Sequence, residues 1–192
     1  MSAELICVAD VAAQPWRNGG GVTRELLAWP SPQRWSVRVS VADVAADGPF
    51  SRFADTQRWF AVLEGEGVEL TIDGATKRLR CGEPPLCFSG EATTTCSLLD
   101  GPTRDLNLML RAARGGMQQV IDSVAWRPEA ACCGLFAAAP GRCTAAGAAY
   151  DMPAASLLWF TQAPEVLLFS SRGAGSTNHG WWLAATPRGA QK

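Results

Sequence analysis

The stretch RWSVRVSVADV at residues 34–44 alternates apolar and polar side chains along its length. One face of the implied strand carries Trp35, Val37, Val39 and Val41, and the other face carries Ser36, Arg38, Ser40 and Ala42. A period of two residues is typical of a β-strand that packs one face against a core. The stretch therefore predicts a strand whose second face bears an arginine and a serine.

Similar alternation recurs along the chain. GVELTIDGATKRL at residues 67–79 contains Asp73-Gly74, a dipeptide that favours the type I′ turn of a hairpin. RDLNLMLR at residues 104–111 sets three leucines opposite Asp105, Asn107, Met109 and Arg111. Shorter apolar segments follow, separated by Gly, Pro and Ser: GLFAAA, SLLWFT, EVLLFSS and WWLAA. Short strands with turn signals about every ten residues predict an all-β sandwich or barrel.

Two segments depart from this pattern. GGMQQVIDSVAW at residues 115–126 predicts a helix, because apolar residues recur near helical spacing at Met117, Val120, Ile121 and Val124. VTRELLAW at residues 22–29 fits both the helical period and the strand period. We expect the hinge between two halves of the chain to lie within residues 112–130.

The composition limits the classes of function. The chain has 192 residues, 47% of them hydrophobic, which is enough for one core or for two small, closely joined halves. Its net charge is −1 and its basic residues are spread out, so nothing indicates binding to nucleic acid or to a membrane. The first residues do not resemble a signal peptide, and no apolar run approaches a membrane span. Seven cysteines without regular spacing indicate reduced thiols in a cytoplasmic protein.

The chain has a single histidine, His179. A mononuclear metal site in a β-barrel needs two or three imidazoles and a carboxylate, which one histidine cannot supply. Cysteines offer no replacement, because there is no C-x-x-C and Cys132 and Cys133 are adjacent. We therefore expect no metal and no cofactor, and we expect His179 to lie in a loop or at the surface.

The glycine run in PWRNGGGVTREL, residues 15–26, lacks the later glycine of a dinucleotide-binding turn and the Gly-Lys-Ser/Thr of a phosphate-binding loop. We interpret it as a turn at the mouth of a barrel that brings backbone N–H groups close to a ligand. Arg17 and Asn18 beside it supply a forked cation and an amide, which suit a carboxylate. The alternative is a strand-linking turn with no ligand, in which glycine only permits the backbone angles.

Polar residues on the predicted strands suggest a second part of the same site. Arg38, Ser40, Asp105, Asn107 and Arg111 lie on strand faces that would point to the interior of a small barrel. A charge there is costly unless it pairs with another group or with a ligand. The alternative is that these are the solvated faces of a sandwich.

These residues resemble the HutD/Ves family, cupin-like bacterial proteins often found with histidine-utilisation genes. The resemblance begins with PWRNGGGVTREL and continues in order through RVSVADV (38–44), DGPFSRF (47–53), RWFAVLEGEGVEL (58–70), FSGE (88–91) and DGPTRDLNLMLR (100–111). It covers about the first 110 residues closely and the remainder only as a weaker second half.

The resemblance implies a bicupin-like, all-β fold of two small barrel or jelly-roll units, residues 1–112 and 113–192. It also implies a small-molecule-binding modulator of histidine degradation. The ligand candidates are the carboxylates urocanate, formylglutamate and formate. The metal-binding histidines of ordinary cupins are absent, in agreement with the single histidine.

The positions that match the family motifs give the predicted ligand-binding set: Trp16, Arg17, Asn18, Gly19, Thr23, Glu25, Arg38, Ser40, Asp105 and Asn107. Gly20, Phe50, Ser51, Arg58 and Met109 also match. We interpret Phe50 as a core or lid aromatic and Met109 as a gap-filler. Asp105 has a second interpretation, in which it holds Arg38 or Arg17 in place.

Three hypotheses follow. The first, which we favour, is a non-catalytic protein that binds a small carboxylate. The second is a metal-independent isomerase or hydrolase that uses Glu25 or Asp105 as general base, with an arginine stabilising negative charge. The third is an interaction protein in which Trp181 and Trp182 are exposed and form a homodimer interface.

Overall fold

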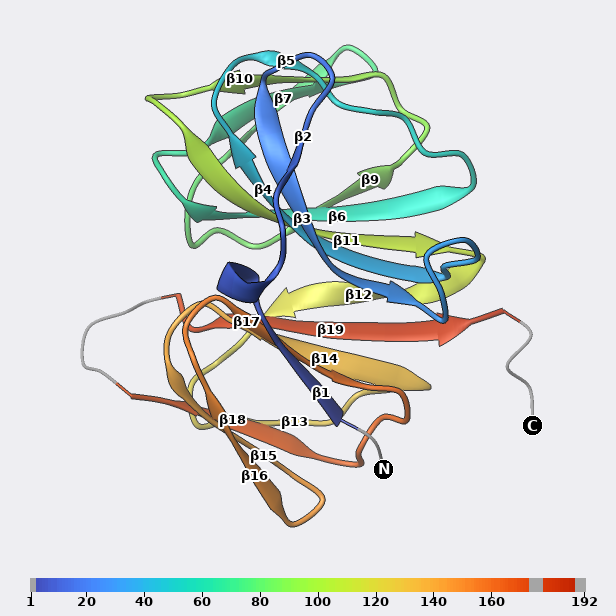
Figure 1. Cartoon of the computed structure of the whole chain (residues 1–192), viewed down its shortest axis with the longest axis vertical. Helices are drawn as coiled ribbons and strands as arrows, with labels where there is room; N and C mark the ends of the chain where they lie inside the picture. Colours follow the sequence, from blue (N-terminus) through green and yellow to red (C-terminus); the bar gives the residue numbers. More distant parts are fainter. Residues whose placement is uncertain (1–2, 173–177, 189–192) are drawn as a thin grey trace. The chain divides into compact units, whose positions relative to one another are not determined.

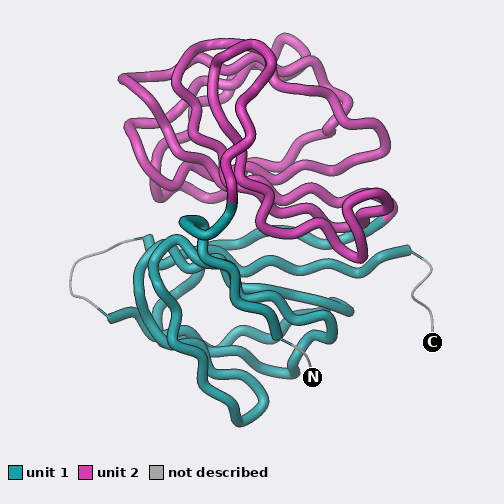
Figure 2. The backbone as a smooth tube through the Cα atoms, in the orientation of Figure 1, with its two compact units in different colours: residues 1–11, 113–192 teal, residues 12–112 magenta. Residues whose placement is uncertain are grey.

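Strands form nearly all of the regular structure in the computed structural model, which describes residues 3–172 and 178–188 (Figure 1). Among these residues the one helical element is a short 3-10 helix, η1 (Val8–Asp10). The predicted all-β class is confirmed. The chain divides into unit 2, residues Ala12–Ala112, and unit 1, which joins Met1–Val11 to Ala113–Lys192 (Figure 2).

The first strand of the chain belongs with the C-terminal half. β1 (Ala3–Cys7) pairs antiparallel with β17 (Ser156–Phe160), so the residues before Ala12 complete a sheet of unit 1. The sequence pattern marks the end of unit 2 after Ala112, but it carries no signal for this long-range pairing.

Unit 2 consists of two antiparallel sheets. The larger has the order β2-β3-β4-β11-β6-β9, and its strands are β2 (Gln14–Pro15), β3 (Gly21–Trp29), β4 (Val37–Val44), β11 (Thr103–Arg111), β6 (Thr56–Glu64) and β9 (Leu86–Ser89). The smaller has the order β5-β10-β7-β8, with β5 (Gly48–Pro49), β10 (Thr94–Leu98), β7 (Val68–Ile72) and β8 (Ala75–Leu79).

Unit 1 repeats the two-sheet plan. Its five-stranded sheet has the order β1-β17-β14-β19-β12, with β14 (Cys132–Ala137), β19 (Gly180–Pro187) and β12 (Ala113–Gln119). Its four-stranded sheet has the order β13-β18-β15-β16, with β13 (Ala125–Trp126), β18 (Leu167–Ser171), β15 (Gly141–Ala145) and β16 (Ala148–Met152).

The interiors of the two units differ in how completely apolar side chains fill them. In unit 1 a large cluster spans both sheets, and it includes Cys133, Leu135, Leu158, Phe160, Phe169 and Trp182. In unit 2 the corresponding cluster is smaller and consists of Phe60, Val62, Val68, Leu70, Leu79 and Cys96. Unit 2 therefore leaves part of its interior to other residues.

The hairpin at Asp73-Gly74 forms as predicted. Both residues have positive φ, 47° and 85°, which is the requirement of a type I′ turn. Antiparallel pairing of β7 with β8 continues on both sides of it.

VTRELLAW is a strand with a bulge. β3 pairs with β4, and the register shifts between Glu25 and Leu27. A bulge adds one residue to a strand, so Leu26 and Leu27 are both buried although they are neighbours. This explains why the segment also fits a helical period.

The helix expected over residues 115–126 is wrong. Ala113–Gln119 is strand β12, paired with β19, and a turn follows it. Met117 and Val120 are buried, whereas Ile121 is 66% and Val124 50% exposed, so the four residues do not share one face. Cross-strand hydrogen bonds to a neighbour distant in sequence outweigh the weak local preference.

Trp181 and Trp182 do not form the exposed patch that the third hypothesis requires. They are 0% and 2% exposed, respectively, and both lie in β19. Trp182 stacks on Trp126 with ring centroids 4.8 Å apart, and Trp181 packs against Phe136. Both side chains are core residues.

No helix within residues 3–172 and 178–188 has the length and apolar character needed to cross a membrane.

The strand assignment of residues 113–124 predicts a contrast between two apolar truncations. Met117→Ala removes a buried side chain and should lower the free energy of unfolding by about 2–5 kcal/mol. Ile121→Ala changes an exposed side chain and should change it by no more than about 0.5 kcal/mol. Urea denaturation of both variants measures the difference. Equal losses would favour the helix, in which both residues share a face.

Candidate functional site

A cavity of about 520 Å³ lies in unit 2 against the inner face of the six-stranded sheet. Sheet residues and the segments around β2 and β5 form its wall: Gln14, Pro15, Trp16, Arg17, Asn18, Thr23, Arg38, Ser40, Ala42, Pro49, Phe50, Ser51, Phe53, Arg58, Asn107 and Met109. The volume is that of a small-molecule site.

Strand register brings the polar residues into two neighbouring rows. Asn107 on β11 lies opposite Ser40 on β4 and Phe60 on β6. Met109, two residues further on, lies opposite Arg38 on β4 and Arg58 on β6. Residues two apart share a face, so two arginines flank the centre of the sheet.

Arg58 is the most deeply placed charge in the cavity wall, with 7% of its surface exposed. Its Nε and Nη2 donate to the side-chain oxygen of Asn107 at 2.8 and 2.6 Å. Within the described part of the chain Nη1 donates no hydrogen bond and Arg58 has no carboxylate within ion-pair distance. The guanidinium is therefore oriented by a neutral amide and keeps its charge available to the cavity.

Three aromatic rings surround the Arg58 guanidinium. Its central carbon lies 4.5 Å from the ring centroid of Phe50, 5.4 Å from that of Phe88 and 6.0 Å from that of Phe60. Such contacts stabilise a desolvated cation by about 1–2 kcal/mol. Burial lowers the pKa of Arg58 to about 10, so the group remains positively charged at neutral pH.

Arg38 lies on β4, on the other side of β11 from Arg58, and is fixed by contacts with Glu25 and Met109. Its Nε donates to a carboxylate oxygen of Glu25 at 2.6 Å, and its Nη1 lies 3.9 Å from the sulfur of Met109. Its guanidinium also faces the ring of Phe53 at 5.7 Å. Glu25 lies opposite Ser40, on the same sheet face, and is engaged by this ion pair, through which it positions Arg38.

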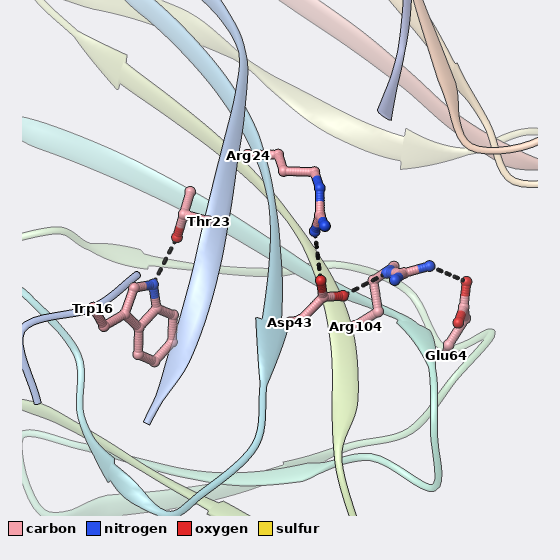
Figure 3. Close-up of polar contacts among 6 residues, drawn as sticks. All are labelled: Trp16, Thr23, Arg24, Asp43, Glu64 and Arg104. Carbon is pink, nitrogen blue, oxygen red and sulfur yellow. Dashed lines mark hydrogen bonds and ion pairs between the residues drawn. The ribbon is translucent and has the colours of Figure 1, made fainter. Parts of the chain in front are cut away.

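Trp16 forms part of the cavity wall and is fixed by its indole N–H, which donates to the Thr23 hydroxyl at 2.7 Å (Figure 3). Its ring meets Phe50 edge-on at a centroid distance of 6.3 Å.

Figure 3 also shows a chain of ion pairs on the opposite face of the sheet, away from the cavity. It runs across β3, β4, β11 and β6 and is formed by Arg24, Asp43, Arg104 and Glu64.

The glycine run is a turn whose own hydrogen bonds close it. Gly19 has a φ of 73° and its N–H donates to the carbonyl of Trp16, while the N–H of Gly20 donates to the side-chain oxygen of Asn18. A side chain at Gly21 would collide with the Trp16 ring and the Asp43 carbonyl. The turn needs glycine for conformation and close approach. The N–H groups of Gly19 and Gly20 are thus not free for a ligand, contrary to the sequence-based interpretation.

Arg17 lies at the exposed rim of the cavity, and its neighbour Asn18 is likewise exposed. The Asn18 oxygen accepts one hydrogen bond, from the Gly20 N–H, and this bond fixes the orientation of the amide. Both residues contribute to the wall, but neither has the burial of Arg58.

The predicted site residues divide into those that line the cavity and those that do not. Trp16, Arg17, Asn18, Thr23, Arg38, Ser40 and Asn107 line it, whereas Gly19, Glu25 and Asp105 do not. Since Glu25 and Asp105 were the candidate general bases, the enzyme hypothesis has no carboxylate at the cavity wall within the described residues.

Sequence reasoning did not assign Arg58, Phe53 or Gln14 to the site. Arg58 carried a readable signal, because it shares a strand face with Phe60 and Val62 in RWFAVLE. A charge in line with core residues has to be paired or functional. Phe53 and Gln14 lie in irregular or very short segments, where periodicity gives no information.

Asp105 lies on the same face of β11 as Asn107, but it is fully buried and is not part of the cavity wall. The Thr103 hydroxyl donates to one carboxyl oxygen at 3.1 Å, and the other oxygen has no partner in the described structure. Burial raises the pKa of Asp105 from 3.8 to about 7, against the opposing effects of Thr103 and of the Arg58 charge. Asp105 therefore titrates near neutrality in the folded protein.

The residues described contain no group of three or more His, Cys, Asp or Glu side chains that could hold a metal ion. The three buried thiols of unit 1, Cys132, Cys133 and Cys143, have pKa values raised by burial to about 12, so they carry no thiolate character.

The sequence model of the HutD family matches residues 8–177. The chain belongs to the HutD family. This confirms the resemblance drawn from the sequence motifs.

Two curated relatives align with the chain. An uncharacterized 21.2 kDa protein in the hutC 3′ region of Pseudomonas putida is 37% identical over 113 residues, which cover 58% of this chain and 60% of that protein. Protein Ves of Cronobacter sakazakii is 35% identical over 112 residues, 58% and 62% of the two chains. The matched stretch thus spans about three fifths of these relatives.

Solved structures resemble the HutD-family chain over nearly its full length. A conserved protein of unknown function from Pseudomonas aeruginosa PAO1 has a TM-score of 0.85 at 29% identity, covering 97% and 98% of the two chains. HutD from Pseudomonas fluorescens SBW25, in a formate condition, has a TM-score of 0.84 at 25% identity, covering 98% and 100%. A cupin 2 conserved barrel protein from Leptotrichia buccalis, TM-score 0.58 at 9% identity and covering 96% of each chain, agrees with the bicupin-like fold class.

The raised pKa of Asp105 predicts a specific pH dependence of stability. Between its ordinary and its folded pKa, the folded protein holds a proton that the unfolded chain has lost, so this contribution to stability falls as pH rises toward 7. From pH 5 to pH 8 the loss should be roughly 2–3 kcal/mol. Asp105→Asn cannot ionise and should escape it, so its stability relative to wild type should rise over that range.

Urea denaturation at each pH measures this difference, with exposed Asp100→Asn as the matched control. A stability difference between Asp105→Asn and wild type that stays constant from pH 5 to pH 8 would contradict the assignment.

Proposed function

We propose that this HutD-family protein binds a small carboxylate in the cavity of unit 2 and thereby takes part in histidine utilisation. The family name and the hutC-region relative support the association with histidine utilisation. The ligand candidates are urocanate, formylglutamate and formate. Binding is favoured over catalysis because the two candidate bases, Glu25 and Asp105, are not among the described residues of the wall.

The observation that carries the proposal is the state of Arg58. A buried guanidinium normally pairs with a carboxylate, because an uncompensated buried charge is costly. Here its described hydrogen bonds go to a neutral amide. A ligand carboxylate would supply the missing negative charge.

The surrounding residues suit the same ligand. Arg38 on β4 and Arg58 on β6 lie on either side of Met109 on β11, so two guanidinium groups of like charge face the same cavity. An anion between them would relieve their repulsion. Trp16, Phe50 and Phe53 give the cavity flat apolar walls, which suit a planar or short-chain acid.

The proposal predicts that Arg58 dominates affinity. Arg58→Lys retains the charge but loses the forked geometry that orients it, and should weaken binding of urocanate or formylglutamate by about tenfold or more. Arg17→Ala should weaken it by only about threefold, because an exposed charge is screened by solvent. Isothermal titration calorimetry measures both.

Arg78→Lys on the exposed hairpin serves as the matched control and should bind like wild type. Thermal unfolding of each variant separates lost binding from lost folding. If no candidate acid gives heat or a thermal shift with the wild-type protein at millimolar concentration, the ligand assignment is wrong.

A further inference from the structure

Among the described residues, the cavity wall has many hydrogen-bond donors and no carboxylate. Arg58 and Arg38 can only donate, and within the described residues the cavity wall contains no Asp or Glu. The carboxylate beside the wall, that of Glu25, is already ion-paired with Arg38, while Arg17 and Arg58 have no described ion pair. The space therefore carries excess positive charge.

The two amides of the wall are fixed by hydrogen bonds that their oxygens accept. The Asn107 oxygen accepts from Nε and Nη2 of Arg58, and the Asn18 oxygen accepts from the N–H of Gly20. Neither an arginine nor a backbone N–H can accept, so turning either amide around would set donor against donor. The Asn107 oxygen accepts two hydrogen bonds and has no capacity left, whereas the Asn18 oxygen accepts one and remains a neutral acceptor.

The remaining acceptors are neutral and weak. Trp16 already donates to the Thr23 hydroxyl, and the other side-chain oxygens of the wall belong to Ser40, Ser51 and Gln14. Asp105 is fully buried off the wall and cannot contact a ligand. A ligand ammonium group would lose its water, meet like charges and find no carboxylate, which costs binding free energy.

We propose that the cavity selects carboxylates that carry no ammonium group, so that it accepts acylated or deaminated acids and rejects free α-amino acids. This rests on the proposed function, because it specifies which carboxylates the same cavity takes. The wall arginines would repel the ammonium group of an amino acid, and that group's N–H donors would find no carboxylate. Selectivity thus comes from penalties on the rejected ligand and not from an extra contact with the accepted one.

Matched pairs of probes test this directly. Calorimetric titration of the wild-type protein compares urocanate with histidine and formylglutamate with glutamate, pairs in which the second member carries the free ammonium group. The acid without the ammonium group should bind at least about tenfold more tightly in any pair that binds.

A charge-introducing variant tests the cause. Gln14→Glu places a carboxylate at the exposed edge of the wall with almost no change in shape, and should narrow the affinity ratio of a pair by about threefold or more. Gln118→Glu on β12 makes the same charge change outside the cavity and should leave the ratio unchanged.

The outcomes separate the two proposals. Equal affinities within a pair, or tighter binding of the amino acid, would overturn the selectivity while leaving carboxylate binding intact. If Gln14→Glu and Gln118→Glu change the affinity ratio of a pair by the same factor, the charge of the cavity wall is not the cause of the selectivity. No binding by either member of both pairs would overturn the proposed function and the selectivity together.

Discussion

The pair formed by Arg58 and Asn107 determines how the interior of unit 2 is organised. Two hydrogen bonds to one amide oxygen fix both the guanidinium and the amide, although the two residues lie on adjacent strands and 49 positions apart in sequence. Phe50, Phe60 and Phe88 pack around the cation and bury most of it. The cavity is thus built around the Arg58 guanidinium, which is buried, held in one orientation and without a described carboxylate partner.

Comparison of the two units shows that the two-sheet fold does not require a buried charge in its interior. Unit 1 has the same two-sheet plan and fills its interior with leucine, phenylalanine, tryptophan and cysteine side chains. Unit 2 gives up part of that apolar packing to Arg38, Arg58, Asn107 and Asp105, each of which is costly to desolvate. The raised pKa of Asp105 reflects part of this desolvation cost, and the proposed ligand would offset the part that falls on Arg58.

Much of the fold was predictable from alternation, because long strands such as β4 and β11 have one dominant period. Failures occurred where local pattern and long-range pairing conflict: the bulge at Glu25–Leu27 resembles a helical turn, and β12 gains its structure from β19. Seven of the ten predicted site residues line the cavity. For Arg58 the sequence shows a charge in line with Phe60 and Val62, but not that β6 lies beside β11, which makes Arg58 the partner of Asn107.

A crystal structure of the protein with bound urocanate or formylglutamate tests the central claim most directly. The account predicts a ligand carboxylate within about 3 Å of Nη1 of Arg58 and facing Arg38, with the Arg58–Asn107 hydrogen bonds retained. A ligand bound outside unit 2, or one whose carboxylate points away from Arg58, would contradict it.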